Sequence, residues 1–161
     1  MHSLAGYAGS WVGANAFRLM PADSPHVAEA TADVSIAAAG NLVQVAYTWS
    51  HPDDGAQDGL LVVGPTAERP GAVALWGDSW HQSPEPKVLV GTMNDGVLIV
   101  SYAYGGDWQW RITVDAVSAD VLVLRMDNVV PQSAATEAVA AGAYPAMVTE
   151  LRRAPGRAML L

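Results

Sequence analysis

Residues 71–82 read GAVALWGDSWHQ and bring two tryptophans, a carboxylate and an imidazole into one short stretch. Side chains alternate between the two faces of a β-strand. A strand over residues 73–81 therefore places Trp76, Asp78 and Trp80 on one face and His81 on the other. We expect this face either to form a band of side chains on the outside of the fold or to line a pocket.

Similar alternation recurs on both sides of this stretch, with turn-forming residues between the segments. Strands are predicted over residues 11–20, 31–39, 42–49, 57–64, 73–81, 87–93, 97–104, 108–115 and 121–128. A short helical turn is predicted over residues 25–30, and Pro84 and Pro86 are expected to end the strand that contains Asp78. The alanine-rich residues 133–141 favour either a helix or a connection to a tenth strand after residue 140.

The regular spacing of short strands, with no amphipathic helix between them, predicts an all-β fold. An antiparallel up-and-down meander of nine to ten strands that closes into a barrel would leave no exposed sheet edge. With 161 residues and no evident linker, the chain is expected to form a single domain over residues 1–161. Residues 152–161 are expected to form a weakly ordered tail.

Two short segments near the start extend this interpretation. Leu4-Ala5-Gly6 and Gly9-Ser10-Trp11-Val12-Gly13 resemble the opening of calycin barrels, and the strand count is similar to the fatty-acid-binding-protein-like branch, which includes nitrobindin-like domains. The resemblance implies a calycin-like barrel that holds a small, mostly apolar ligand, with Trp11 as a structural plug. Nitrobindin-like members bind haem through a histidine in a late strand, and no histidine follows His81, so that motif does not carry over.

Composition excludes several classes of function. The chain carries 16 acidic and 8 basic residues, a net charge of −8 that would repel nucleic acids and anionic membranes. Cysteine is absent, and neither an N-terminal apolar signal segment nor an apolar run long enough to span a membrane is evident. We therefore expect a cytoplasmic protein that binds neither nucleic acid nor membranes. The sequence is also compatible with a homodimer.

Six tryptophans and five tyrosines against one phenylalanine favour a pocket whose apolar rings also carry polar atoms. The predicted ligand-binding residues are Tyr47, Trp49, Trp76, Trp80, Trp110 and Arg125. Because a buried arginine normally has an acidic partner, Arg125 is expected to pair with Asp127 or Asp78. The leading hypothesis is binding of a small hydrophobic or aromatic molecule inside the barrel.

An alternative is an isomerase, cyclase or hydrolase on the same barrel, with Asp78 and His81 as the candidate catalytic acid and base. The two side chains can meet only if a bulge or the end of the strand interrupts the alternation. A third hypothesis is a structural domain with a filled core. The sequence contains no phosphate-binding loop, dinucleotide fingerprint or nucleophile elbow, and neither a metal site nor a cofactor is predicted.

Overall fold

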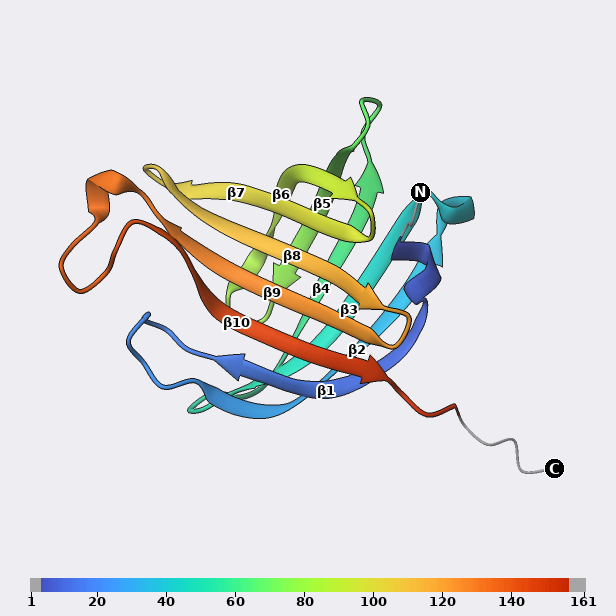
Figure 1. The fold of residues 1–161 in the computed structure, drawn as a ribbon, viewed down its shortest axis with the longest axis horizontal. Helices are drawn as coiled ribbons and strands as arrows, with labels where there is room; N and C mark the ends of the chain where they lie inside the picture. The colour runs from blue at the N-terminus through green and yellow to red at the C-terminus, as the bar shows by residue number, and fades with distance from the viewer. Residues whose placement is uncertain (1–3, 157–161) are drawn as a thin grey trace.

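The computed structural model describes residues 4–156 and shows a closed barrel of ten antiparallel strands (Figure 1). Each strand pairs with its neighbours along the chain, and the first pairs with the last. The strands are β1 Gly9–Phe17, β2 His26–Ala37, β3 Leu42–His51, β4 Gly55–Pro65, β5 Gly71–Asp78, β6 Gln82–Asn94, β7 Val97–Gly105, β8 Trp108–Ser118, β9 Val121–Val130 and β10 Gly142–Arg153. The predicted all-β up-and-down barrel, including a tenth strand, is confirmed.

Two predictions about local structure are wrong. The helical turn expected over residues 25–30 is the start of β2, which pairs with β1 from His26 opposite Phe17 and so satisfies its backbone groups in the sheet. Pro84 and Pro86 lie inside β6 rather than outside any strand. They are tolerated because residues 83–86 have no partner in the pairing of β6 with β5 or β7, so no ladder hydrogen bond is lost.

The connection between β9 and β10 is not an α-helix. It contains only the short 3-10 helix η3, Gln132–Ala134, and otherwise runs irregularly to Gly142 (Figure 1). The expected tail at residue 152 begins later than predicted, because β10 continues to Arg153 and pairs there with Trp11 of β1. The last five residues of that tail, 157–161, lie outside the described residues.

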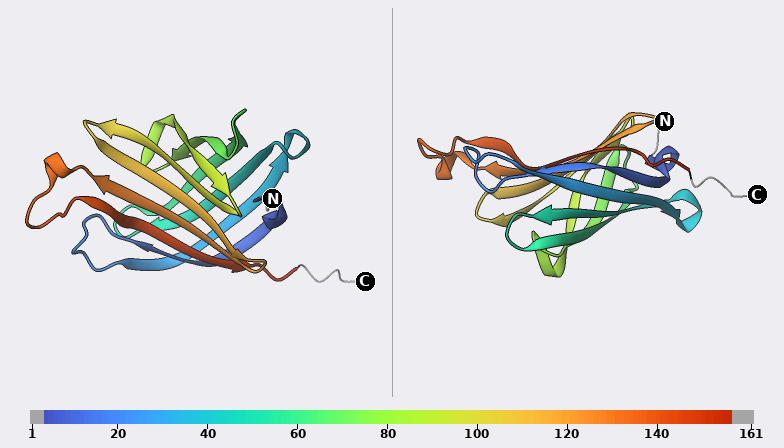
Figure 2. Two further views of the ribbon diagram at one scale, coloured as in Figure 1. Left: turned by 45° about the horizontal axis from the view of Figure 1, so that its top comes forward. Right: turned by 90° about the horizontal axis from the view of Figure 1, so that it is seen from below.

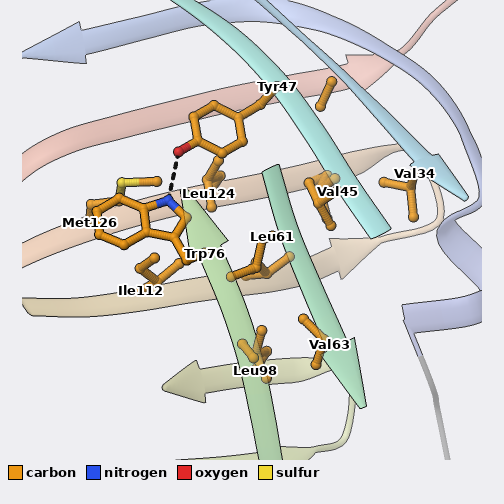
Figure 3. Packing of buried hydrophobic residues seen from close by; sticks show 14 of the residues in the cluster. Val34, Val45, Tyr47, Leu61, Val63, Trp76, Leu98, Ile112, Leu124 and Met126 are labelled. Atoms are coloured by element: carbon orange, nitrogen blue, oxygen red, sulfur yellow. Dashed lines mark hydrogen bonds between the residues drawn. The ribbon is translucent and has the colours of Figure 1, made fainter. Parts of the chain in front are cut away.

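Alternation along the strands sends one set of side chains into the barrel. In β3, Val43, Val45, Tyr47 and Trp49 are all buried, while the residues between them face outward. Figure 3 shows Val45 and Tyr47 packed with Leu61 and Trp76 from β4 and β5 and with Leu124 from β9. Burial of each large apolar side chain contributes about 1.5–3 kcal/mol.

One end of the barrel is closed by the 3-10 helix η1, Leu4–Tyr7 (Figure 2). Leu4 is buried, and the Trp11 indole nitrogen donates a hydrogen bond of 2.9 Å to the carbonyl oxygen of Tyr7. The guanidinium carbon of Arg153 lies 4.5 Å from the centroid of the Trp11 ring, a cation–π contact between the first and last strands. Trp11 therefore plugs this end. Within residues 4–156, no helix has the length and apolar character needed to cross a membrane.

Candidate functional site

A pocket of about 590 Å³ lies at the opposite end of the barrel. It is bounded by the connections β1–β2, β5–β6 and β9–β10 and by the adjoining ends of β8, β9 and β10. Most of its lining is aromatic or aliphatic, and its rings come from Phe17, Trp80, His81, Trp108, Trp110 and Tyr144. We call this cavity the mouth pocket.

Hydrogen bonds to backbone carbonyls hold the rim of the mouth pocket together. Arg18 donates from Nε to Pro145 O at 2.9 Å and from its terminal nitrogen to Pro21 O at 2.8 Å, which ties the β1–β2 connection to β10. The Tyr144 hydroxyl donates to Leu19 O at 3.0 Å and accepts a bond from the Asn128 amide. These bonds therefore fix the rim by joining the β1–β2 connection to strands β9 and β10.

The inner wall of the pocket is a layered set of rings. The His81 imidazole stacks on Trp49 with a centroid separation of 5.0 Å and also lies 5.0 Å from Trp110. Trp110 in turn stacks on Trp76 at 5.9 Å, with only 13° between the planes. The pocket rings therefore pack directly on buried core rings, and this packing fixes their positions.

Asp78 lies beneath these rings and is 3% exposed. Its Oδ2 accepts hydrogen bonds from the Tyr47 hydroxyl at 2.7 Å and from the Trp49 indole at 3.2 Å. Its Oδ1 accepts the backbone N–H groups of Trp80 and His81 at 2.9 and 2.8 Å. Four donors therefore surround this carboxylate, and two of them set the course of the turn that carries the pocket rings Trp80 and His81.

Gly59 makes this arrangement possible. It lies between Tyr47 and Asp78 in the register of β3, β4 and β5. A Cβ added to Gly59 would stand 2.2 Å from the Tyr47 ring, so a side chain there is sterically excluded. The tyrosine ring occupies that space instead, and its hydroxyl, which also accepts a 2.9 Å bond from the Trp76 indole, reaches across to Asp78.

His81 lies beside Asp78 because β5 ends at Asp78 and the pairing register with β6 shifts there. The interruption allows the contact that strict alternation would prevent, but the contact joins the His81 backbone and the carboxylate, not the two side chains. His81 Nε2 lies 2.9 Å from Met147 Sδ. Burial lowers the pKa of His81 to about 4; the Asp78 carboxylate opposes this shift and His51 adds to it. The imidazole is therefore neutral at pH 7.

His51 ties two turns at the rim together. Its Nδ1 accepts the backbone N–H groups of Asp53 and Asp54 at 3.1 Å each, which assigns the ring proton to Nε2 in the neutral form. The ring stacks on Trp80 at 4.6 Å, and the Trp80 indole donates to Asp54 Oδ2 at 2.8 Å. The β3–β4 and β5–β6 turns are thus locked to each other.

The predicted site residues separate into three groups. Trp80, His81 and Trp110 line the mouth pocket. A second group, Tyr47, Trp49, Trp76 and Asp78, lies beneath it in the core. Arg125 lies apart on the outer face of β9, where its Nε contacts Asp127 Oδ1 at 2.8 Å, so that Asp127 rather than Asp78 is its partner.

Sequence reasoning missed several pocket residues. Trp108 shares a strand face with Trp110, a signal that could have added it to the site. Ala134, Thr136 and Val139 line the pocket from the β9–β10 connection, and an alanine-rich loop gives no comparable signal. The Trp110 indole nitrogen is buried without a hydrogen-bond partner among residues 4–156.

Within the described part of the chain, no three histidine, aspartate or glutamate side chains gather closely enough to hold a metal ion. Comparison with known proteins gives no match, either to a protein-family model or to a curated protein sequence.

Proposed function

We propose that the protein is a calycin-like barrel that binds a small aromatic or otherwise apolar molecule in the mouth pocket. The observation that carries the proposal is the pocket itself: about 590 Å³, bounded by six rings and set on a packed core. Ligand sites are typically clefts of roughly 300–1,000 Å³ with apolar linings and a few polar groups. The opening segments that resemble calycin barrels add support from the sequence.

The lining favours a flat ring system over a flexible chain. Trp110, Trp80 and His81 present ring faces and edges whose positions are fixed by stacking on Trp76, His51 and Trp49. Rigid aromatic walls lose little side-chain entropy on binding and prefer offset or edge-to-face contacts with another ring. The pocket is therefore preorganised for an aromatic ligand.

Asp78 and His81 have different roles in this proposal. Asp78 is a positioning residue, because its four hydrogen-bond donors hold the turn of Trp80 and His81 and the carboxylate does not line the pocket. His81 lines the pocket as a neutral ring and would contact the ligand directly. These contacts favour binding over acid–base catalysis by Asp78.

The neutral fluorescent probe N-phenyl-1-naphthylamine tests the proposal. We expect its emission to rise on binding and tryptophan emission to fall, because Trp80, Trp108 and Trp110 border the pocket. Ala134→Trp would fill the pocket from η3 and weaken binding at least about tenfold. Val27→Trp adds the same ring at a position that is 65% exposed on β2, and should leave affinity unchanged. Wild-type affinity in the folded Ala134→Trp variant would overturn the proposal.

A further inference from the structure

The outer surface of β4, β5 and β6 is aliphatic, which is unusual for an outward-facing sheet. No charged residue occurs in residues 60–64, 71–77 or 88–92, which are the paired central parts of these strands. Their outward positions and those of the adjoining strands form a surface that we call the aliphatic wall, made of Leu42, Leu60, Val62, Val73, Leu75, Val88, Val90 and Ile99.

The pairing register places these side chains beside one another. One row across the sheet joins Val62 of β4, Leu75 of β5 and Val88 of β6. The next row joins Val73 of β5 to Val90 of β6. Cross-strand neighbours of this kind have Cβ atoms about 4.5–5.5 Å apart, so the aliphatic wall is continuous rather than scattered.

The strands on either side are polar. Outward positions of β2 carry Asp33 and Ser35, and outward positions of β8 carry Arg111, Thr113 and Asp115. In Figure 1, β4, β5 and β6 lie together on one side of the barrel, away from the β1–β10 seam. The aliphatic wall therefore has a polar boundary, as expected of an interface core with a polar rim.

The aliphatic wall is also shallowly grooved. A groove of about 460 Å³ runs over it, lined by residues that include Leu42, Val62 and Leu75. Outward-facing Gly64 contributes no side chain, and a Cβ there would stand 3.0 Å from the Leu42 side chain. The alternation of aliphatic side chains with glycine gives ridges and a hollow that a copy of the same surface can interlock with.

We propose that the aliphatic wall is the interface of a homodimer in which two copies pack these sheet faces together. Leu60, Leu75 and Ile99 are 43–47% exposed, and Val88 and Val90 are both 62% exposed. Together the wall presents on the order of 600 Å² of apolar surface, the upper end for a monomer's largest patch. Standard interfaces bury about 800 Å² from each partner. The aliphatic wall together with a narrow polar rim is therefore large enough to form a dimer interface of standard size.

The charge distribution leaves the aliphatic wall as the face on which two copies can meet. Each chain has a net charge of −8, so two copies repel one another over most of their surfaces. The aliphatic wall is an uncharged face, and a two-fold axis through it would bring identical apolar rows together without burying a charge. An isologous contact of this kind also closes on itself, and so leaves no free copy of the wall to recruit further chains.

Sedimentation equilibrium of the full chain tests the proposal. The wild type is expected to have a mass twice the 16.9 kDa of one chain, and Val88→Lys should raise the dimer dissociation constant roughly a hundredfold or more, because two-fold symmetry buries two unpaired charges. Val27→Lys is the matched control. Val27 is 65% exposed, compared with 62% for Val88, but it lies on β2 outside the aliphatic wall, and its substitution should leave the dimer intact.

The absence of cysteine provides a second readout. Leu75→Cys near the centre of the aliphatic wall should form a disulfide-linked dimer on mild oxidation, and Val27→Cys should not. A wild type that remains monomeric at all concentrations, or a dimer that survives Val88→Lys, would overturn the proposal. A third result would also overturn it: the monomeric wild type floats with neutral phosphatidylcholine vesicles, and Val88→Lys abolishes this binding. The aliphatic wall would then be a lipid-binding surface.

Discussion

The two ends of the barrel use the same residue type in opposite ways. At the closed end, Trp11 is fully buried, its indole nitrogen is paired with Tyr7 O, and its ring is covered by Arg153. At the mouth pocket, Trp80 and Trp110 are only partly buried, and the indole nitrogen of Trp110 has no partner within residues 4–156. A tryptophan whose contacts are complete serves as structure, and one that retains an unused ring face can serve recognition.

The difference arises from how each end is connected. The closed end is covered by a single turn, η1, whose Leu4 side chain enters the barrel. The mouth end is bordered by the long β1–β2 and β9–β10 connections. Arg18 and Tyr144 hold the first of these against β10 at the rim, and it does not enter the barrel as a plug. One end of the barrel is therefore closed and stabilising, whereas the other is open and carries the mouth pocket. Substitutions can test each end separately.

The largest effect is expected at the closed end. Trp11→Ala removes a fully buried ring and the surface on which Arg153 rests, and should lower the free energy of unfolding by about 4 kcal/mol. Trp108→Ala at the mouth should lower it by about 1 kcal/mol or less, since that ring is partly exposed. Urea denaturation measures both. Equal losses would contradict the division between the two ends.

A smaller effect is expected beneath the mouth pocket. Asp78→Asn replaces one carboxylate oxygen with an amide group that cannot accept, so two of the four donors face another donor. The free energy of unfolding should fall by about 3 kcal/mol. Asp95→Asn, the same change in the exposed β6–β7 turn, should alter it by less than about 0.5 kcal/mol. A loss at Asp78 no larger than at Asp95 would show that the carboxylate does not hold the turn.

Local sequence rules predicted most of the barrel, since alternation and turn residues are local properties. The strand predicted over residues 42–49 is an example, because it is observed as β3 with alternating burial. The rules failed where a partner strand decides the outcome. Residues 26–30 are strand because β1 lies beside them, and prolines are tolerated in β6 because residues 83–86 have no pairing partner in β5 or β7.

The site was harder to predict than the fold. Trp80, His81 and Trp110 come from two segments of a predicted strand pattern, and the structure brings them to one pocket. Alternation placed Asp78 and His81 apart, whereas the shift in register at the end of β5 joins them through the backbone. The contribution of Gly59 was invisible, because a glycine in a strand does not reveal which ring fills its place. These contacts depend on the pairing register between strands that are distant in the sequence, which local sequence patterns do not specify.

The smallest effect is expected from His81 at the mouth end, where it should make the free energy of unfolding depend on pH. In the unfolded chain the His81 imidazole has a pKa of about 6.5. In the folded protein burial of the ring lowers this pKa to about 4. The unfolded state therefore binds more protons between these values, so stability is complete above pH 6.5 and falls as the pH drops towards 4. At pH 5 the free energy of unfolding should be about 2 kcal/mol lower than at pH 7 from this group. His81→Gln cannot titrate and should lose correspondingly less over the same interval in urea denaturation at the two pH values. Identical losses in wild type and variant would mean that His81 is solvated at neutral pH, and the mouth pocket would then lack the dry inner wall on which binding of an apolar ring depends.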